Sequence, residues 1–171
     1  MAKKKKEEAK SGGEKGGKEL KIVTYHVITR DKVVANERQM SLLYIIDRFG
    51  PLHEKTLMEL AQAIQEMGYE LGYTFKQVGG SPFSPELKND LIALMYVGFV
   101  ETEPNLYRKL KTTSDGKDAL EKATIPQGLV DVINKNFEKL RNKASIRDQE
   151  LDLEIRKRLE VVRRPRRRGF F

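Results

Sequence analysis

The excess positive charge of this chain is confined to its two ends, which limits the fold to the residues between them. Residues 1–20 hold seven Lys against four Glu, and residues 154–171 hold eight Lys and Arg against two Glu. Residues 21–153 hold 18 basic and 19 acidic side chains, so the centre is close to neutral. Polar segments rich in charge cannot bury enough apolar surface to offset the entropy of ordering. We therefore expect one core, built from about 130 central residues.

The composition excludes several kinds of site. The chain has no Cys, which excludes disulfides and thiolate metal ligands. Its two histidines, His26 and His53, are far apart in the sequence, so a histidine metal centre is not expected. The longest apolar run, 91–100, is about half the length of a membrane span. No apolar secretory segment follows the basic N-terminus. We expect a cytoplasmic protein with no cofactor, no metal and no membrane association.

Catalytic motifs are also missing from the sequence. We find no phosphate-binding Gly-Lys loop, no paired-histidine zinc motif and no nucleophile elbow. Ser81 follows Gly79-Gly80 as a nucleophile would, but Pro82 comes next and neither histidine is near in sequence. We therefore expect no enzymatic activity.

The N-terminal segments differ in character. Residues 1–20 are polar and rich in Lys, and we predict a disordered tail that serves either solubility or binding. Residues 21–30 are dense in β-branched and aromatic side chains, which favours a strand or an extended segment along the domain edge. His26 in this segment is interpreted as a packed side chain rather than a ligand.

Apolar spacing predicts two helices in the next part of the chain. Residues 36–49 carry apolar side chains at helical spacing and stop at Gly50-Pro51. Residues 53–67 show the same spacing and stop at Gly68. A polar connection follows, with a short extended piece expected at 73–78.

A third helix, a hairpin and a short closing helix complete the domain. Ser84-Pro85-Glu86 supplies a capping hydroxyl, a proline at the first helical position and an acid at the positive helix end. Residues 99–103 and 106–112 alternate in character around Pro104-Asn105, which predicts a β-hairpin leading into a helix near Ser114. The expected fold class is mainly α with a small β-hairpin, a winged helix-turn-helix over residues 21–124.

The C-terminal part, 125–162, is predicted to be one long helix. Its apolar positions recur every eleven residues, which keeps a nearly straight stripe on one face. Ser145 with Asp148 offers a capping pair, so a break near residue 144 is an alternative. The stripe either folds back on its own domain or forms a homodimer, and one stripe does not decide between the two. The candidate dimerisation residues are Leu129, Ile133, Leu140, Leu151 and Ile155.

Two local patterns resemble the winged-helix DNA-binding superfamily. Thr113-Ser-Asp-Gly116 resembles the Thr-x-x-Gly that closes the wing in many regulators, where Thr begins the last helix and Gly lets it pack closely. Ser81-Pro-Phe-Ser-Pro-Glu-Leu87, together with Gly98-Phe99-Val100, resembles a G-P-[FY]-S-x-E-L … G-L-[IV] stretch. That stretch occurs in a prokaryotic group that includes phage- and toxin–antitoxin-associated proteins. Ser81-Pro82 stands where that group has Gly-Pro. The resemblance covers residues 40–122 and implies DNA binding.

By this resemblance, the helix that begins at Ser84 would be the recognition helix. Its expected exposed side chains include two acids and only one Lys, which suits a phosphate-lined groove poorly: Glu86, Lys88, Asn89 and Asp90. Lys88 and Asn89 would make any base contacts. Three cations of the hairpin would contact the minor groove or the backbone, or would merely solvate an exposed strand: Arg108, Lys109 and Lys111.

The C-terminal segment, 163–171, gives the strongest nucleic-acid signal. Arg binds phosphate in a bidentate manner and stacks on bases. Phe170 and Phe171 would stack on unpaired bases, enter a pocket of a protein partner, or fold onto the domain. The predicted phosphate-contacting residues of the two tails are Lys3, Lys4, Lys5, Lys6, Arg163, Arg164, Arg166, Arg167 and Arg168.

The sequence therefore predicts a non-enzymatic, transcription-associated DNA-binding protein, dimeric through the long helix and associated with the nucleoid. Two alternatives stay open. A Lys-rich tail ahead of a small winged helix also resembles archaeal and eukaryotic ribosomal proteins, which makes RNA or the ribosome an alternative partner. Winged helices also serve as protein-interaction adaptors, because a fold does not fix a function.

Overall fold

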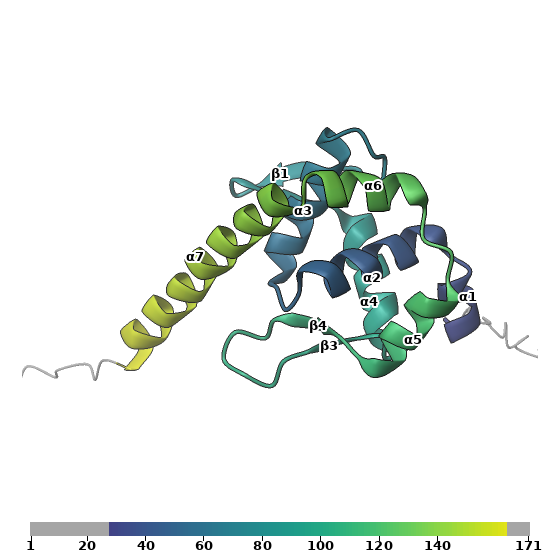
Figure 1. Ribbon diagram of the computed structural model, residues 1–171. Coiled ribbons are helices and arrows are strands. Elements are labelled where there is room, and N and C mark those ends of the chain that lie inside the picture. The colour runs from purple at the N-terminus through teal and green to yellow at the C-terminus, as the bar shows by residue number, and fades with distance from the viewer. Residues whose placement is uncertain (1–27, 164–171) are drawn as a thin grey trace, which may run out of the picture.

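The computed structural model describes residues 28–163, which form one mainly helical domain with two short β-hairpins (Figure 1). The mainly α fold class with a small hairpin and a long C-terminal helix is thus confirmed. Within this range no helix is long and apolar enough to cross a membrane. The elements are α1 (Arg30–Val34), α2 (Glu37–Phe49), α3 (Glu54–Glu66), β1 (Lys76–Val78), β2 (Ser81–Phe83), α4 (Pro85–Tyr96), β3 (Val100–Thr102), β4 (Leu110–Thr112), α5 (Ser114–Lys122), α6 (Gln127–Lys135) and α7 (Phe137–Arg163).

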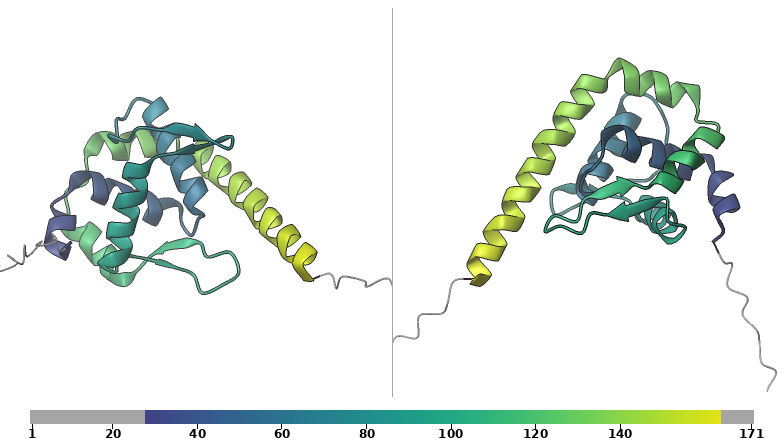
Figure 2. Two further views of the ribbon diagram at one scale, coloured as in Figure 1. Left: turned by 180° about the vertical axis from the view of Figure 1, so that it is seen from behind. Right: turned by 60° about the horizontal axis from the view of Figure 1, so that its bottom comes forward.

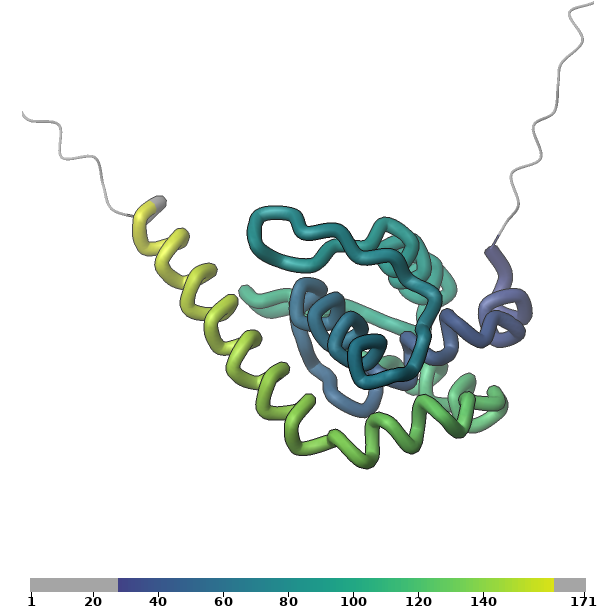
Figure 3. Tube along the Cα trace, turned by 90° about the horizontal axis from the view of Figure 1, so that it is seen from above, coloured from purple at the N-terminus to yellow at the C-terminus, as the bar shows by residue number. Residues whose placement is uncertain are grey.

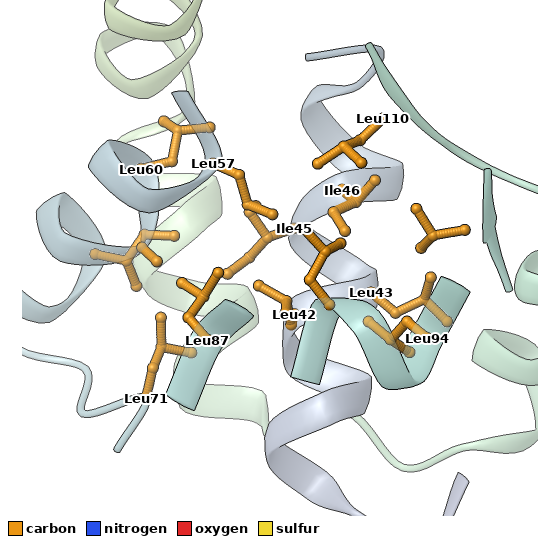
Figure 4. Close-up of a cluster of buried hydrophobic side chains, with 14 of the residues drawn as sticks. Leu42, Leu43, Ile45, Ile46, Leu57, Leu60, Leu71, Leu87, Leu94 and Leu110 are labelled. Carbon is orange, nitrogen blue, oxygen red and sulfur yellow. The ribbon is translucent and has the colours of Figure 1, made fainter. Parts of the chain in front are cut away.

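Helix α2 is the centre of the core. Asn36 caps it by accepting hydrogen bonds from the backbone amides of Arg38 and Gln39. The apolar side chains of α2 point in more than one direction, which is typical of a helix covered on several sides. Figure 4 shows Ile45 and Ile46 of α2 among leucines that come from α3, α4 and β4: Leu57, Leu60, Leu87, Leu94 and Leu110.

Helices α2, α3 and α4 followed by the β3–β4 hairpin give the order of elements expected of a winged helix (Figure 2). Strands β3 and β4 pair antiparallel, with Val100 opposite Thr112. Leu52 adds a third short strand position, since its backbone exchanges two hydrogen bonds with that of Leu110, of 3.2 and 2.8 Å. The hairpin is therefore joined to the chain between α2 and α3.

The Thr-x-x-Gly pattern has the geometry that its resemblance implies. The hydroxyl of Thr113 accepts a hydrogen bond from the amide of Gly116 at 3.1 Å and donates one to the carbonyl of Gly98 at 2.7 Å. A Cβ atom at position 116 would lie 2.3 Å from the carbonyl oxygen of Phe99. Only glycine therefore lets α5 lie this close to β3.

Two segments, one N-terminal and one central, differ from the sequence prediction. Residues 1–27, including His26, lie outside the described residues, and Arg30 begins α1 rather than ending a strand. The extended piece at 73–78 has a partner that the sequence analysis did not assign: β1 pairs with β2 through a two-residue turn at Gly79-Gly80. Both glycines have positive φ, +59° and +79°, as a type I′ hairpin turn requires.

The C-terminal part is two helices rather than one, and they meet at an angle (Figure 3). The break falls at Asn136, not near residue 144, and α7 is continuous through that region. At the break Phe137 turns inward and its ring stacks on that of Phe49, with centroids 5.5 Å apart. The bend lets Leu129 of α6 and Leu140 of α7 enter the same core, so the core does not end at residue 124.

Candidate nucleic-acid interface

Helix α4 is the helix that the resemblance named as the candidate recognition helix. Ser84 caps it, accepting a hydrogen bond from the amide of Leu87 at 3.3 Å. Lys88 and Asn89 are exposed, as expected, but the Lys88 ammonium lies 3.2 Å from the carboxylate of Glu54. Beyond them the outer face is apolar, with exposed fractions of 52% for Ile92, 38% for Met95 and 68% for Tyr96. We call these three residues the α4 apolar face.

Asp90 corrects the expected charge of this helix. It was expected on the surface but is only 4% exposed. Its carboxylate accepts hydrogen bonds from the guanidinium of Arg38 at 2.6 Å, from the side-chain amide of Gln39 at 2.9 Å and from the hydroxyl of Tyr73 at 3.1 Å. Burial, and then the charge of Asp90, raise the pKa of the Tyr73 hydroxyl. Asp90 therefore joins α2 and the 69–75 segment to α4, and the outer face of α4 is less acidic than predicted.

The three predicted cations of the β3–β4 hairpin lie in different environments. Arg108 and Lys111 are exposed. Arg108 has a positive φ of 48°, in a turn where the side chain of Asn105 accepts from the amides of Tyr107 and Arg108 at 3.0 Å each. Lys109 points inward instead, and only 17% of its side chain is exposed. It therefore does not belong to the surface on which Arg108 and Lys111 lie.

The ammonium of Lys109 lies between two carboxylates of α7, 3.0 Å from Asp148 and 3.1 Å from Asp152. Burial alone would lower the pKa of Lys109, but the hydrogen bonds to both carboxylates outweigh it and raise the pKa. Burial alone would raise the pKa of Asp152, but the hydrogen bonds from His53 and Lys109 outweigh burial and lower the pKa.

The same carboxylates fix α7 to the start of α3. Oδ1 of Asp148 accepts from the backbone amide of His53 at 3.1 Å and from the hydroxyl of Thr56 at 2.5 Å, so it takes the part of an N-cap. Nε2 of His53 lies 2.8 Å from Asp152. We call Asp148, Asp152, His53, Thr56 and Lys109 the α7 lock.

Two further contacts lie on either side of the α7 lock along the helix. The guanidinium of Arg147 lies 2.8 Å from the carboxylate of Glu59 and donates to the hydroxyl of Ser81 at 3.1 Å. The guanidinium of Arg156 donates to the hydroxyl of Tyr107 in the wing.

The candidate dimerisation residues are occupied within the single chain. Leu129, Ile133, Leu140 and Leu151 are buried, and Ile155 is half-buried. Of the two alternatives for the apolar stripe, the burial of these four side chains agrees with folding back on its own domain. The surface that they would offer to a second copy is already covered.

A group of cations that the sequence analysis did not single out lies where α2 ends and α6 meets α7. All are exposed, and none forms an ion pair with another residue of 28–163. The guanidinium of Arg48 lies 4.8 Å from the ring of Phe137. We call the group the cationic corner: Arg48, Lys135, Lys139, Arg141 and Lys143.

Two surface hollows open at this corner. The first is lined by Arg48, Lys135 and Lys139 together with two Asn amides and one acid, Glu138. The second, of about 330 Å³, includes Arg141 with the polar side chains of Ser145 and Gln149, next to the α7 lock. Arg48 is far in sequence from Lys135 and Lys139, with which it lines the first hollow at the bend at Asn136.

The predicted tail residues lie almost entirely outside the described range. This applies to Lys3–Lys6, Arg164, 166–168 and Phe170-Phe171, while Arg163 is the last residue of α7. Residues 28–163 hold 21 Lys and Arg and 21 Asp and Glu, so the formal charge of +8 lies wholly outside them.

Comparisons with protein-family models, with curated proteins and with solved structures yield no match for this chain. The functional interpretation therefore depends on the side chains described above. They define a small helical domain, neutral overall, with an apolar face on α4 and a cationic corner between α2, α6 and α7.

Proposed function

We propose that the protein binds nucleic acid, with duplex DNA as its first ligand, mainly through contacts to the phosphate backbone. The observation that carries the proposal is the distribution of charge. Residues 28–163 are neutral, and the segments that continue from both ends of this range hold the whole excess of +8. Cationic segments bind polyanions by releasing condensed counterions, with little dependence on base sequence.

The outer surface of α4 offers few groups for base recognition. Base recognition needs side chains that donate or accept hydrogen bonds at several positions of the recognition helix. On α4 Lys88 and Asn89 are such residues, whereas Ile92, Met95 and Tyr96 are apolar. The resemblance of 113–116 and 81–87 to winged-helix regulators favours a transcription-associated role, with DNA ahead of RNA.

The test is a titration of the full-length protein on duplex DNA and on RNA of the same length across a salt series. We expect affinity for DNA to fall steeply with salt, by about 0.9 in log–log slope for each phosphate contact. Replacing Lys3–Lys6 by Gln, or Arg164 and 166–168 by Gln, should each lower the slope by up to about 4. Absence of binding at low salt would overturn the proposal, and tighter binding to RNA would transfer it to the ribosomal alternative.

A protein-docking role is the second candidate, and the α4 apolar face favours it. Exposed apolar side chains on adjacent helical turns are typical of surfaces that bind a partner. A variant with Ile92→Ser and Tyr96→Ser separates the two roles. Unchanged DNA affinity would leave this face free for a protein partner, whereas a loss of affinity would place the face on DNA.

A further inference from the structure

We infer that the cationic corner is a phosphate-binding site on the folded domain, which holds the backbone of duplex DNA away from α4. The inference rests on the proposed function, since its ligand is nucleic acid, and it names the part of the folded domain that binds. It concerns five residues from three elements: Arg48, Lys135, Lys139, Arg141 and Lys143.

The corner differs from α5 in how its charges are mixed. The ten residues 134–143 hold four cations and one acid, Glu138. On α5, by contrast, Lys117 and Lys122 are interleaved with three acids between positions 115 and 121. Interleaved charges cancel within a Debye length of about 8 Å, whereas like charges on one surface attract a polyanion.

The position of one cation in the corner is fixed before any ligand binds. The guanidinium of Arg48 lies over the ring of Phe137, which is itself stacked on Phe49. An Arg held in this way loses less side-chain entropy on binding and presents its planar fork to a phosphate. Neutral polar side chains line the same two hollows, Asn134 and Asn136 in the first and Ser145 and Gln149 in the second, together with one acid in each, Glu138 and Asp148. The side-chain amide of Asn136 already donates to the carbonyl of Val132, and that of Gln149 to the hydroxyl of Ser145. This mixture of Arg, Lys and amide or hydroxyl donors is the usual set for phosphate oxygens.

The spacing along α7 suits a duplex. Lys139 and Lys143 are one helical turn apart, about 6 Å, which is close to the rise of two nucleotides in one strand. Lys139 is 24 residues from Arg163, where the Arg-rich segment begins. That is about 36 Å along a helix, close to one turn of B-DNA.

The position of the corner in the fold agrees with this arrangement. Figure 1 shows α1, where the described range begins, and the end of α7, where it stops, on opposite sides of the molecule. The bend between α6 and α7 lies between them, on the side of the domain away from the β3–β4 hairpin. A duplex held at the corner would thus have a rigid contact between the two cationic ends of the chain.

The experiment compares two full-length variants that each lose three exposed lysines. The corner variant carries Lys135→Gln, Lys139→Gln and Lys143→Gln. The control carries Lys32→Gln, Lys117→Gln and Lys122→Gln, which are also exposed and without ion pairs in residues 28–163. Circular dichroism checks that both fold. Affinity for a duplex of about 24 base pairs is then measured between about 50 and 200 mM salt.

We expect the corner variant to lower the salt slope by about 2 to 3 and to weaken binding about 10-fold or more, with the control changing the slope by less than about 1. An equal loss in both variants would show that net charge alone matters and would overturn the inference. If the corner variant keeps the wild-type affinity and salt slope, the inference is overturned while the proposed function stays intact. Failure of the wild type to bind would instead remove the proposed function.

Discussion

Helices α4 and α7 differ in how the surfaces predicted from their sequences compare with the surfaces in the structure. Helix α4 was expected to present polar and acidic side chains outward, yet Asp90 is buried and Ile92, Met95 and Tyr96 are exposed. The apolar stripe of α7 was expected either to fold back on its own domain or to meet a second copy, and Leu140 and Leu151 are buried within the single chain. The comparison teaches that a charge pattern or an apolar stripe says what a helix carries, while long-range partners decide which side faces water.

The two helices also differ in what holds them. Helix α4 is held mainly by leucines that pack on α2 and α3, with one buried carboxylate. Helix α7 combines an apolar stripe with the α7 lock, in which Asp148 and Asp152 of α7 contact Lys109 just before β4 and His53 and Thr56 at the start of α3. Changes to α7 should therefore test both packing and electrostatics, whereas changes on the outer face of α4 should test neither.

The largest effect is expected from Leu140→Ala. Leu140 is fully buried, so its truncation removes apolar contacts and leaves a cavity, at a cost of about 3 kcal/mol in the free energy of unfolding. Urea denaturation measures this cost, with Ile146→Ala, at an exposed position of the same helix, as the control. The cost should not depend on protein concentration, because Leu140 packs within one chain. A midpoint that rises with concentration would favour the dimer instead.

Asp148→Ala should be the next most destabilising change. It removes the carboxylate that caps α3 and leaves the amide of His53 and one side of Lys109 without a partner, a cost of about 2–3 kcal/mol. The matched control is Glu154→Gln, an exposed acid on α7 without an ion pair in residues 28–163. Equal midpoints for the two variants in urea would show that the α7 lock adds no stability.

The α7 lock also predicts a dependence on pH. The pKa of Asp152 is lowered in the folded protein, so the unfolded chain takes up a proton first as the pH falls. The stabilisation is fully present above the unfolded pKa, near 4, and is lost as pH falls through the lower folded pKa. Asp152→Asn should flatten the urea midpoint between pH 5 and about pH 2, and a parallel curve would contradict this.

Local signals in the sequence predicted most element boundaries. Asn36 and Ser84 cap the helices that the sequence pattern starts at them, and Thr113 caps the helix that the resemblance starts at it. These starts could be predicted because capping depends on neighbouring backbone amides. The break at Asn136 was not predicted, since it depends on Phe137 finding Phe49 in another helix. No neighbouring residue in the sequence carries that information.

The candidate site divides in the same way. The inward position of Asp90 had a signal in the sequence, because it lies three residues after Leu87 and four before Leu94, on the same helical side. The inward position of Lys109 had none, since its partners on α7 are about 40 residues away and it lies between exposed Arg108 and buried Leu110. The cationic corner likewise required the bend that brings α2 beside α7.

The smallest effect is expected on the outer face of α4, and it completes the comparison with α7. Ile92→Ser combined with Tyr96→Ser should change the free energy of unfolding by less than about 1 kcal/mol, because both side chains are mostly exposed. Leu94→Ala on the buried side of the same helix is the positive control, at about 3 kcal/mol. A large loss in the serine variant would mean that Ile92 and Tyr96 are covered in solution. The α4 apolar face would then be part of the fold, and the protein-docking candidate would lose its support.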